Sequence, residues 1–175
     1  MKKITEVLWD ILPETYEEFL EEAGEKLYDP ETAAALFICA LRIFIRDQSE
    51  GIRCLKLITF NDSDDAPLYY PRLSQIAGKQ AYLPDSYFEN ATAENGYSHP
   101  LPCKTVIKSD NAKGIRRDCK TVYIGCGGSG NFRPVTLVNI SEEKIYASFR
   151  ELKPENSMWF VKDFVSLLSD VKPPV

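Results

Sequence analysis

The sequence predicts an α+β fold, with N-terminal helices packed on a C-terminal antiparallel sheet of four to five strands. The prediction rests on the spacing of apolar residues, which is helical in the first half of the chain and changes to a period of two from Cys103 onward. Helices followed by a run of strands are typical of this class. Because no repeat or long linker interrupts the 175 residues, we expect one domain covering 1–175.

Helices are predicted over most of the first half. The first, short and amphipathic, precedes Pro13 and has apolar residues at helical spacing: Ile4, Val7, Leu8, Ile11 and Leu12. The same pattern repeats over 16–27. Residues 52–60 fit either a helix or a short strand, and 71–78 could form one more short helix.

The clearest helix start in the sequence is Asp29-Pro30-Glu31. Asp29 can cap the helix, Pro30 suits the first turn because its missing N–H is not needed there, and Glu31 complements the helix dipole. The helix should run to about residue 47. Because it is apolar on nearly every face through Leu41, we expect it at the centre of the fold.

The second half predicts strands at 104–109, 119–126, 133–140, 144–152 and 158–163. Between the second and third of these, Gly125 to Gly130 has the spacing GxGxxG of a dinucleotide-binding loop. Such a loop must open a helix, whereas the next residues are β-branched and alternating. We therefore predict a flexible hairpin turn and expect no cofactor here. By analogy alone, this order of elements suits the cone-shaped fold of steroid-isomerase-like proteins.

Composition indicates a soluble protein of the cytosol. The longest apolar run, 33–41, is too short to cross a membrane, so no membrane partner is expected. Glu6 and Asp10 interrupt the apolar stretch that a secretion signal would need after Lys2 and Lys3. The five cysteines show no disulfide spacing, and reduced, partly buried thiols are expected.

The net charge of −5 is spread unevenly: −7 over 1–50, −2 over 51–98 and +4 over 99–175. Such asymmetry can mark a nucleic-acid surface, here one built from Lys104, Lys108, Lys113, Arg116, Arg117 and Lys120. Because the basic excess is small, we favour a mutual attraction between the two halves of one domain and disfavour nucleic acid as a partner.

A resemblance to a known family comes from the segment Tyr82 to Tyr97, YLPDSYFENATAENGY. It resembles a family of small bacterial proteins whose segment reads YLPxSYFxGATPENxY. That family is a domain of unknown function, so the resemblance implies a kind of protein and no activity. Further similar features are DPETAAALFICAL, Arg133-Pro134 after a Gly/Ser-rich turn, Trp159 and Lys172-Pro173-Pro174, so that it spans about 29–174. Asn90 and Ala93 depart from the pattern; if a positive φ is needed at Asn90, asparagine tolerates it best among non-glycine residues.

Catalytic and metal patterns are weak in this chain. Zinc held by His99, Cys103, Cys119 and Cys126 is arithmetically possible, but structural zinc usually takes closely spaced pairs, so we expect no metal. Cys126 at the glycine-rich turn could pair with His99 as nucleophile and base, although an unreactive buried thiol is the simpler interpretation.

Aromatic residues gather before the strands, and they support our leading functional hypothesis. They are Tyr69, Tyr70, Tyr82, Tyr87, Phe88 and Tyr97. Tyrosines in loops pack on the core or line binding surfaces. Arg133 could add a charged anchor for an anionic group, or form a salt bridge to the acidic half.

We therefore predict a non-catalytic cytosolic bacterial protein that binds an unknown protein partner or small molecule through Tyr82, Tyr87, Tyr97 and Arg133. The alternative is a small-metabolite enzyme with a pocket between helices and sheet, using Asp85, Glu94 or Cys126.

Overall fold

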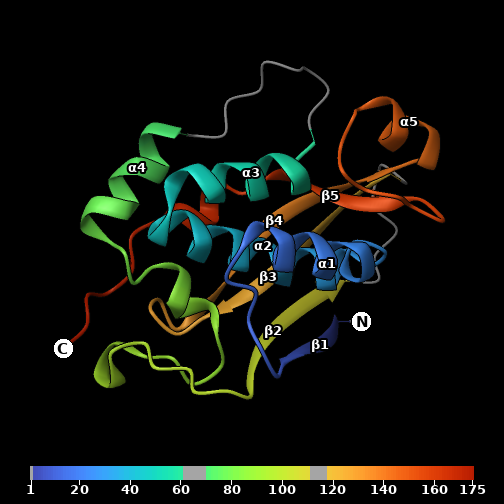
Figure 1. The fold of residues 1–175 in the computed structure, drawn as a ribbon. Coiled ribbons are helices and arrows are strands. Elements are labelled where there is room, and N and C mark those ends of the chain that lie inside the picture. The colour runs from blue at the N-terminus through green and yellow to red at the C-terminus, as the bar shows by residue number, and fades with distance from the viewer. Residues whose placement is uncertain (1, 61–69, 111–117) are drawn as a thin grey trace.

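The described part of the chain, residues 2–60, 70–110 and 118–175 of the computed structural model, contains one antiparallel sheet with the strand order β1-β2-β3-β4-β5 (Figure 1). The last four strands follow one another as a meander, and the N-terminal strand adds to the free edge of β2. The strands are β1 (Lys2–Trp9), β2 (Cys103–Asp110), β3 (Cys119–Cys126), β4 (Asn131–Ile140) and β5 (Met158–Asp163).

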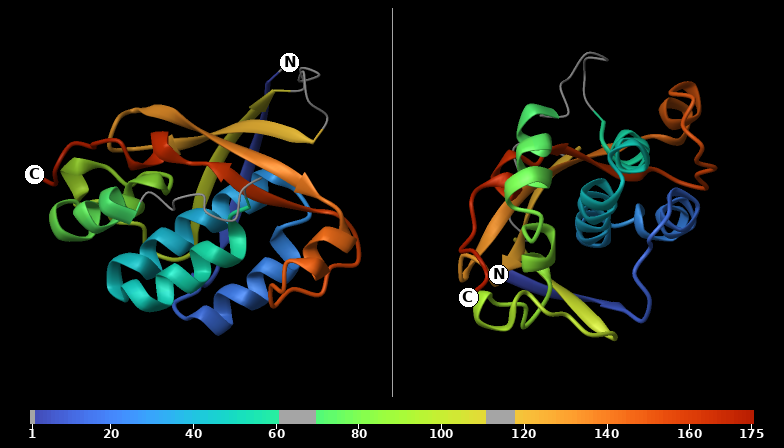
Figure 2. Two further views of the ribbon diagram at one scale, coloured as in Figure 1. Left: turned by 90° about the horizontal axis from the view of Figure 1, so that it is seen from above. Right: turned by 60° about the vertical axis from the view of Figure 1, so that its left-hand side comes forward.

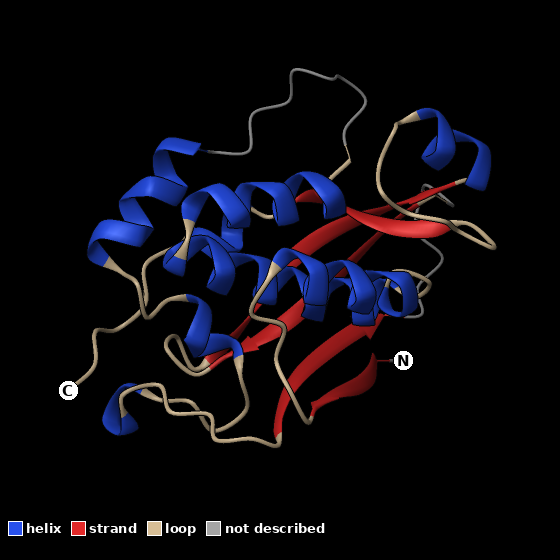
Figure 3. Cartoon of the chain, viewed as in Figure 1, coloured by secondary structure: helices blue, strands red, loops and turns tan. Residues whose placement is uncertain are grey.

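Three helices cover one face of this sheet: α1 (Tyr16–Lys26), α2 (Pro30–Arg46) and α3 (Gln48–Ile58) (Figures 2 and 3). The α+β prediction is therefore confirmed. The remaining helices lie at the margins, with α4 and α5 at opposite ends of the molecule in Figure 1. They are α4 (Tyr70–Lys79), α5 (Glu142–Ala147) and three short 3-10 helices, η1 (Pro84–Tyr87), η2 (Ala93–Asn95) and η3 (Val165–Leu168).

Helix α2 lies at the centre of the fold, as its composition predicts. Every side chain from Ala33 to Ala40 is 0% exposed, and the helix contacts α1, α3, α4 and all five strands. Burying each large apolar side chain stabilises the fold by roughly 1.5–3 kcal/mol. Pro30 is the first helical residue, as predicted, but the Asp29 side chain makes no capping hydrogen bond. The nearby Thr32 hydroxyl donates to the carbonyl oxygen of Lys26, the last residue of α1, at 2.5 Å.

The predicted helix at residues 4–12 is wrong, because residues 2–9 form strand β1. Its side chains alternate: Val7 and Trp9 are buried, whereas Ile4 and Leu8 are 61% and 54% exposed. Apolar residues three and four apart favour a helix, but this short stretch also has Val7 and Trp9 two apart, as in a strand, so spacing alone could not decide. The decision comes from pairing with β2 and from Trp9, whose Nε1 donates to Thr105 Oγ1 at 3.0 Å.

The predicted strand at 144–152 is also wrong. Ser141 caps helix α5 there, since its side chain accepts a hydrogen bond from Lys144 N. Strand β5 then pairs directly with β4, so the fifth strand of the sheet comes from the N-terminus. The ambiguous stretch 52–60 has both characters: α3 continues to Ile58, and Thr59 then forms an isolated parallel bridge with Val161. The short helix predicted at 71–78 is confirmed by α4.

Opposite charges connect the acidic helical half to the basic sheet. Lys120 Nζ of β3 lies 3.1 Å from Glu31 Oε1 at the start of α2. Within β1 and β2, Lys104 pairs with Glu6, at 3.0 Å. These two lysines of the candidate nucleic-acid surface therefore have carboxylate partners, while Lys113, Arg116 and Arg117 lie outside the described residues.

Glu31 should give the stability of the protein a pH dependence. Burial raises the pKa of Glu31, but the hydrogen bonds of the carboxylate, from its own backbone N–H and from Lys120, outweigh burial and lower it overall. A pKa below that of the unfolded chain stabilises the fold above the unfolded value and stops doing so as pH falls through the folded value. Glu31→Gln should therefore lower the free energy of unfolding by about 1–2 kcal/mol at neutral pH, with the difference disappearing in acid. Urea unfolding at several pH values measures this, with the exposed Glu25→Gln as control; a pH-independent loss would contradict it.

Phe149 occupies a backbone conformation that suits glycine. It follows the C-cap of α5 with φ of 59°, and its side chain is 94% exposed. The left-handed region costs a residue with a Cβ roughly 1–2 kcal/mol, partly offset by the larger entropy loss of glycine. Phe149→Gly should therefore raise the free energy of unfolding by about 0.5–1 kcal/mol. Phe149→Ala, which removes the ring but keeps the Cβ, should give no such gain, and equal stabilisation by both variants would contradict the backbone origin.

Candidate functional site

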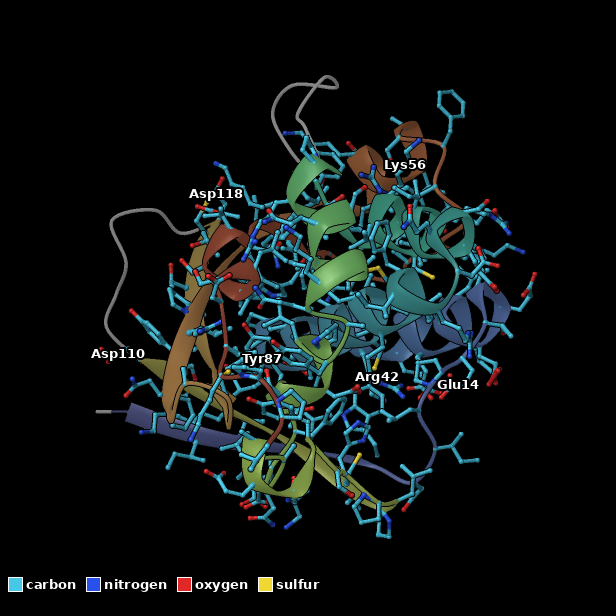
Figure 4. All side chains as sticks on the ribbon, turned by 90° about the vertical axis from the view of Figure 1, so that its left-hand side faces the viewer. Glu14, Arg42, Lys56, Tyr87, Asp110 and Asp118 are labelled. Carbon is cyan, nitrogen blue, oxygen red and sulfur yellow. The ribbon has the colours of Figure 1, made fainter. Side chains whose placement is uncertain are left out.

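The candidate site lies at the end of the molecule where the C-terminal end of α2, residues 82–103, the β3–β4 hairpin and residues 165–175 meet. Figure 4 looks onto this end, with Tyr87 near the middle and Arg42 and Glu14 to one side. The segments 82–103 and 165–175 have little regular structure, so many of their backbone groups need side-chain or loop partners.

Tyr87 connects three of these parts. Its side chain is 0% exposed, and its hydroxyl donates to Leu167 O at 2.5 Å. Arg133 Nη1 in turn donates to the Tyr87 hydroxyl, at 3.2 Å. Burial raises the pKa of Tyr87 far above its ordinary value despite the nearby Arg133, so the phenol stays neutral and remains a donor. Tyr87 thus joins η1 to η3 within the core.

Tyr97 plays a similar part further along residues 165–175. Its hydroxyl donates to Lys172 O, and its ring stacks on that of Tyr82 with centroids 5.6 Å apart. Tyr97 is buried and Tyr82 half-buried. The loop before Tyr97 contains Asn90 at φ of 68°, so the positive φ considered for this position from the sequence is present. Tyr69 and the side chain of Tyr70 lie outside the described residues.

Arg133 donates to backbone carbonyls. Its Nη1 lies 2.6 Å from Ser169 O and its Nη2 lies 2.6 Å from Asp170 O. The guanidinium is planar and rigid, so it can satisfy two successive carbonyl groups at once. Within the described residues, these carbonyl contacts take the place of the salt bridge to the acidic half that was one of the two roles expected for Arg133.

Arg72 on α4 and Gln80 directly after it complete the contacts to the same segment. Arg72 Nε donates to Leu168 O at 2.9 Å, and Arg72 Nη2 lies 2.8 Å from Asp170 Oδ1. Gln80 Nε2 donates to the same carboxylate oxygen, at 2.7 Å. The Gln80 hydrogen bond and the Arg72 charge lower the pKa of Asp170. Sequence reasoning missed Arg72 and Gln80, because nothing in their local pattern points to a partner 90 or more residues away.

The hairpin glycines are explained by close approach. The GxGxxG spacing belongs to a turn between β3 and β4, so the predicted hairpin is confirmed. A Cβ on Gly127 would lie 1.7 Å from Ala91 O, and one on Gly128 would lie 2.6 Å from the Cβ of Val171. These two glycines therefore let the hairpin touch residues 82–97 on one side and residues 165–175 on the other. The flexibility predicted for this turn is therefore not the reason for Gly127 and Gly128. Close packing against the neighbouring segments is the reason for both glycines.

An ion-pair network holds the 82–103 segment onto α2. Asp85 Oδ1 lies 2.8 Å from His99 Nε2 and 3.1 Å from Arg42 Nε. Arg42 also faces Glu14, which pairs with Arg46 at 2.6 Å. The His99 ring stacks on buried Phe88, with centroids 4.3 Å apart. Of these residues, the sequence analysis considered Asp85 and His99, but it could not pair them with each other or with Arg42. Their ion pairs hold residues 82–103 against the C-terminal end of α2.

The other catalytic candidates are placed apart. Cys126 is buried and its Sγ lies 3.4 Å from Ser86 Oγ, whereas His99 contacts Asp85 and Phe88. Glu94 is exposed and pairs with Lys172 at 3.4 Å. Among the described residues, no group of three or more His, Cys, Asp or Glu side chains is arranged to hold a metal ion. All five cysteines are free, and burial raises the pKa of Cys54 to about 12.

The fold and this site define an α+β protein whose two irregular segments bind each other through tyrosine and arginine side chains. The chain belongs to the family described as Domain of unknown function (DUF6935), whose profile matches residues 11–175. No curated protein and no solved structure matches the chain, so the steroid-isomerase-like shape stays a prediction. Within the described ranges, none of the helices has the length and apolar character needed to cross a membrane.

Gly128→Ala should release residues 169–175 while the core stays folded. The new Cβ would meet the Cβ of Val171 at 2.6 Å and the Tyr97 hydroxyl at 2.9 Å. The Lys172 amide, which donates to Gly128 O, and the Val175 amide, which donates to Ala93 O, should then exchange hydrogen at least tenfold faster, equivalent to about 1.4 kcal/mol of lost protection. Native-state hydrogen exchange measures this. Gly24→Ala, where a Cβ meets nothing within 4 Å, should leave both rates unchanged; unaltered protection in Gly128→Ala would contradict the close packing.

Proposed function

We propose that this protein is a non-catalytic interaction module that binds a partner protein through the surface formed by residues 82–97 and the Arg133 hairpin. The hypothesis retains the four predicted binding residues: Tyr82 and Arg133 are partly exposed, and the buried Tyr87 and Tyr97 take part through their hydroxyl groups. It also retains the cytosol as the place where the protein acts, which fits five free cysteines.

One observation carries the proposal: this surface already binds a stretch of polypeptide, which runs from the short helix η3 into residues without helix or strand. Side chains donate to the carbonyl oxygens of five residues within a six-residue stretch: Leu167, Leu168, Ser169, Asp170 and Lys172. Donors from η1, β4, α4 and Tyr97, two residues beyond η2, all converge on one stretch of backbone. Recognition through main-chain groups is a recurring way in which proteins bind peptides of partners.

The packing between helices and sheet supports binding over the alternative of an enzyme with an internal pocket. The α2 side chains Phe37 and Ile38 are 0% exposed, as is Phe160 on β5. A small-molecule site usually combines a concave apolar space with a few convergent polar groups. Here the polar groups gather at one end of the molecule, where they contact polypeptide.

Arg133→Gln should abolish partner binding with only a modest effect on folding, because the residue lies partly at the surface. The experiment immobilises the full chain, captures proteins from a lysate of the source cells and quantifies them for wild type, Arg133→Gln and Arg46→Gln. Arg46 is a matched control, since it is 49% exposed and pairs with Glu14 away from the hairpin. We expect at least a tenfold loss of the captured partner for Arg133→Gln, or about 1.4 kcal/mol of binding free energy, and none for Arg46→Gln.

The variants must first show the same circular dichroism spectrum and a cooperative thermal transition. Tyr82→Ala, at the half-buried member of the stacked tyrosine pair, provides a second independent probe of the same surface. A partner that binds wild type and folded Arg133→Gln equally well would refute the proposal.

A further inference from the structure

Residues 169–175 are held in the way that a bound peptide is held. They form no helix or strand, and Val171 is the only one of the seven whose side chain is buried. The preceding Leu167 and Leu168 are 0% and 1% exposed, so they anchor the chain in the core up to that point. Releasing residues 169–175 from the surface would therefore expose much less apolar area than releasing Leu167 and Leu168.

The backbone of these seven residues is recognised along its length. Arg133 donates to the carbonyls of Ser169 and Asp170, and Tyr97 donates to that of Lys172. In the other direction, the Lys172 amide donates to Gly128 O at 3.3 Å and the Val175 amide donates to Ala93 O at 3.0 Å. Such contacts do not depend on side-chain identity, so any extended chain of suitable shape could make them.

Two side-chain contacts add selectivity. The Asp170 carboxylate accepts hydrogen bonds from Arg72 and Gln80, and the positive charge of Arg72 favours an acidic group at this position. The next side chain, Val171, is 7% exposed and packs against the backbone of Gly128, which leaves no room for a Cβ there. The site therefore selects an acidic residue followed directly by a branched aliphatic one.

We propose that residues 169–175 occupy the partner site in cis, and that the partner is a protein supplying an extended segment with an acidic residue followed by a branched aliphatic residue, which displaces them. This inference rests on the proposed function, since it names the partner chemistry and the regulation of the same surface. The tethered segment acts at an effective concentration in the millimolar range, so it suppresses weak ligands. A partner must bind more strongly than the segment does, or bind when the segment has been released.

The probe is a synthetic acetylated peptide matching residues 169–175, Ser-Asp-Val-Lys-Pro-Pro-Val, added to the isotope-labelled full chain and followed by NMR. Val171→Gly weakens the segment in cis without changing the surface that holds it. We expect saturable shifts of the Gly128 and Ala93 amides in Val171→Gly, with a Kd at least tenfold lower than for wild type. A peptide carrying Lys in place of Asp should bind at least tenfold more weakly.

Two further variants act on the receiving surface. Val171→Gly combined with Arg133→Gln should lose peptide binding, because the guanidinium N–H groups that donate to two successive carbonyl oxygens are missing. Gly128→Ala should release the segment but take up no peptide, because its Cβ blocks the aliphatic position. Each variant is first checked for the dispersed amide spectrum of a folded protein.

Three results would overturn the inference. The first is no saturable shift in Val171→Gly at several millimolar peptide, where even a Kd of about 1 mM gives substantial occupancy. The others are equal affinity for wild type and Val171→Gly, or binding that survives Arg133→Gln. The titration uses only the purified chain and a peptide. Its failure therefore leaves Arg133-dependent capture of a partner standing, whereas capture that ignores Arg133 counts against the proposed function itself.

Discussion

The burial of α2 is the constraint on which the rest of the structure depends. Its middle is enclosed by helices on one side and by the sheet on the other, so apolar packing sets its position. Once α2 is placed, Arg42 at its last turns is directed toward Asp85, which fixes the start of the 82–103 segment. That segment carries Tyr87 and Tyr97, which in turn hold residues 165–175. A few polar contacts therefore fix the two irregular segments to the apolar core.

The two irregular segments solve a common problem. Chain that is neither helix nor strand has carbonyl and N–H groups without regular partners, and burying them unpaired costs free energy. Here phenol and guanidinium groups supply the missing donors, and the hairpin glycines allow the backbones to approach closely. The arrangement that stabilises the chain is also the one on which the proposed partner binding depends, so a stabilising contact and a binding surface can be the same feature.

Part of this site could be foreseen from the sequence. Tyr82, Tyr87, Tyr97 and Arg133 were indicated by the concentration of aromatic residues and by a basic residue beside a glycine-rich turn. Their partners could not be, because backbone carbonyl groups are present at every residue and leave no signature in a sequence. Asp85, His99 and Arg42 illustrate the same limit, since each is an ordinary charged residue until the fold brings the three together.

By itself, the sequence determined the elements whose local pattern is unambiguous: the central helix beginning at Pro30, the hairpin between β3 and β4, and the change from helical to alternating spacing near Cys103. Tertiary structure decided the rest. Residues 2–9 became a strand because β2 offers an open edge, and residues 142–147 became a helix because Ser141 caps it and β5 pairs directly with β4. The physical reason is that short apolar patterns fit more than one element, and pairing energy from distant residues selects between them.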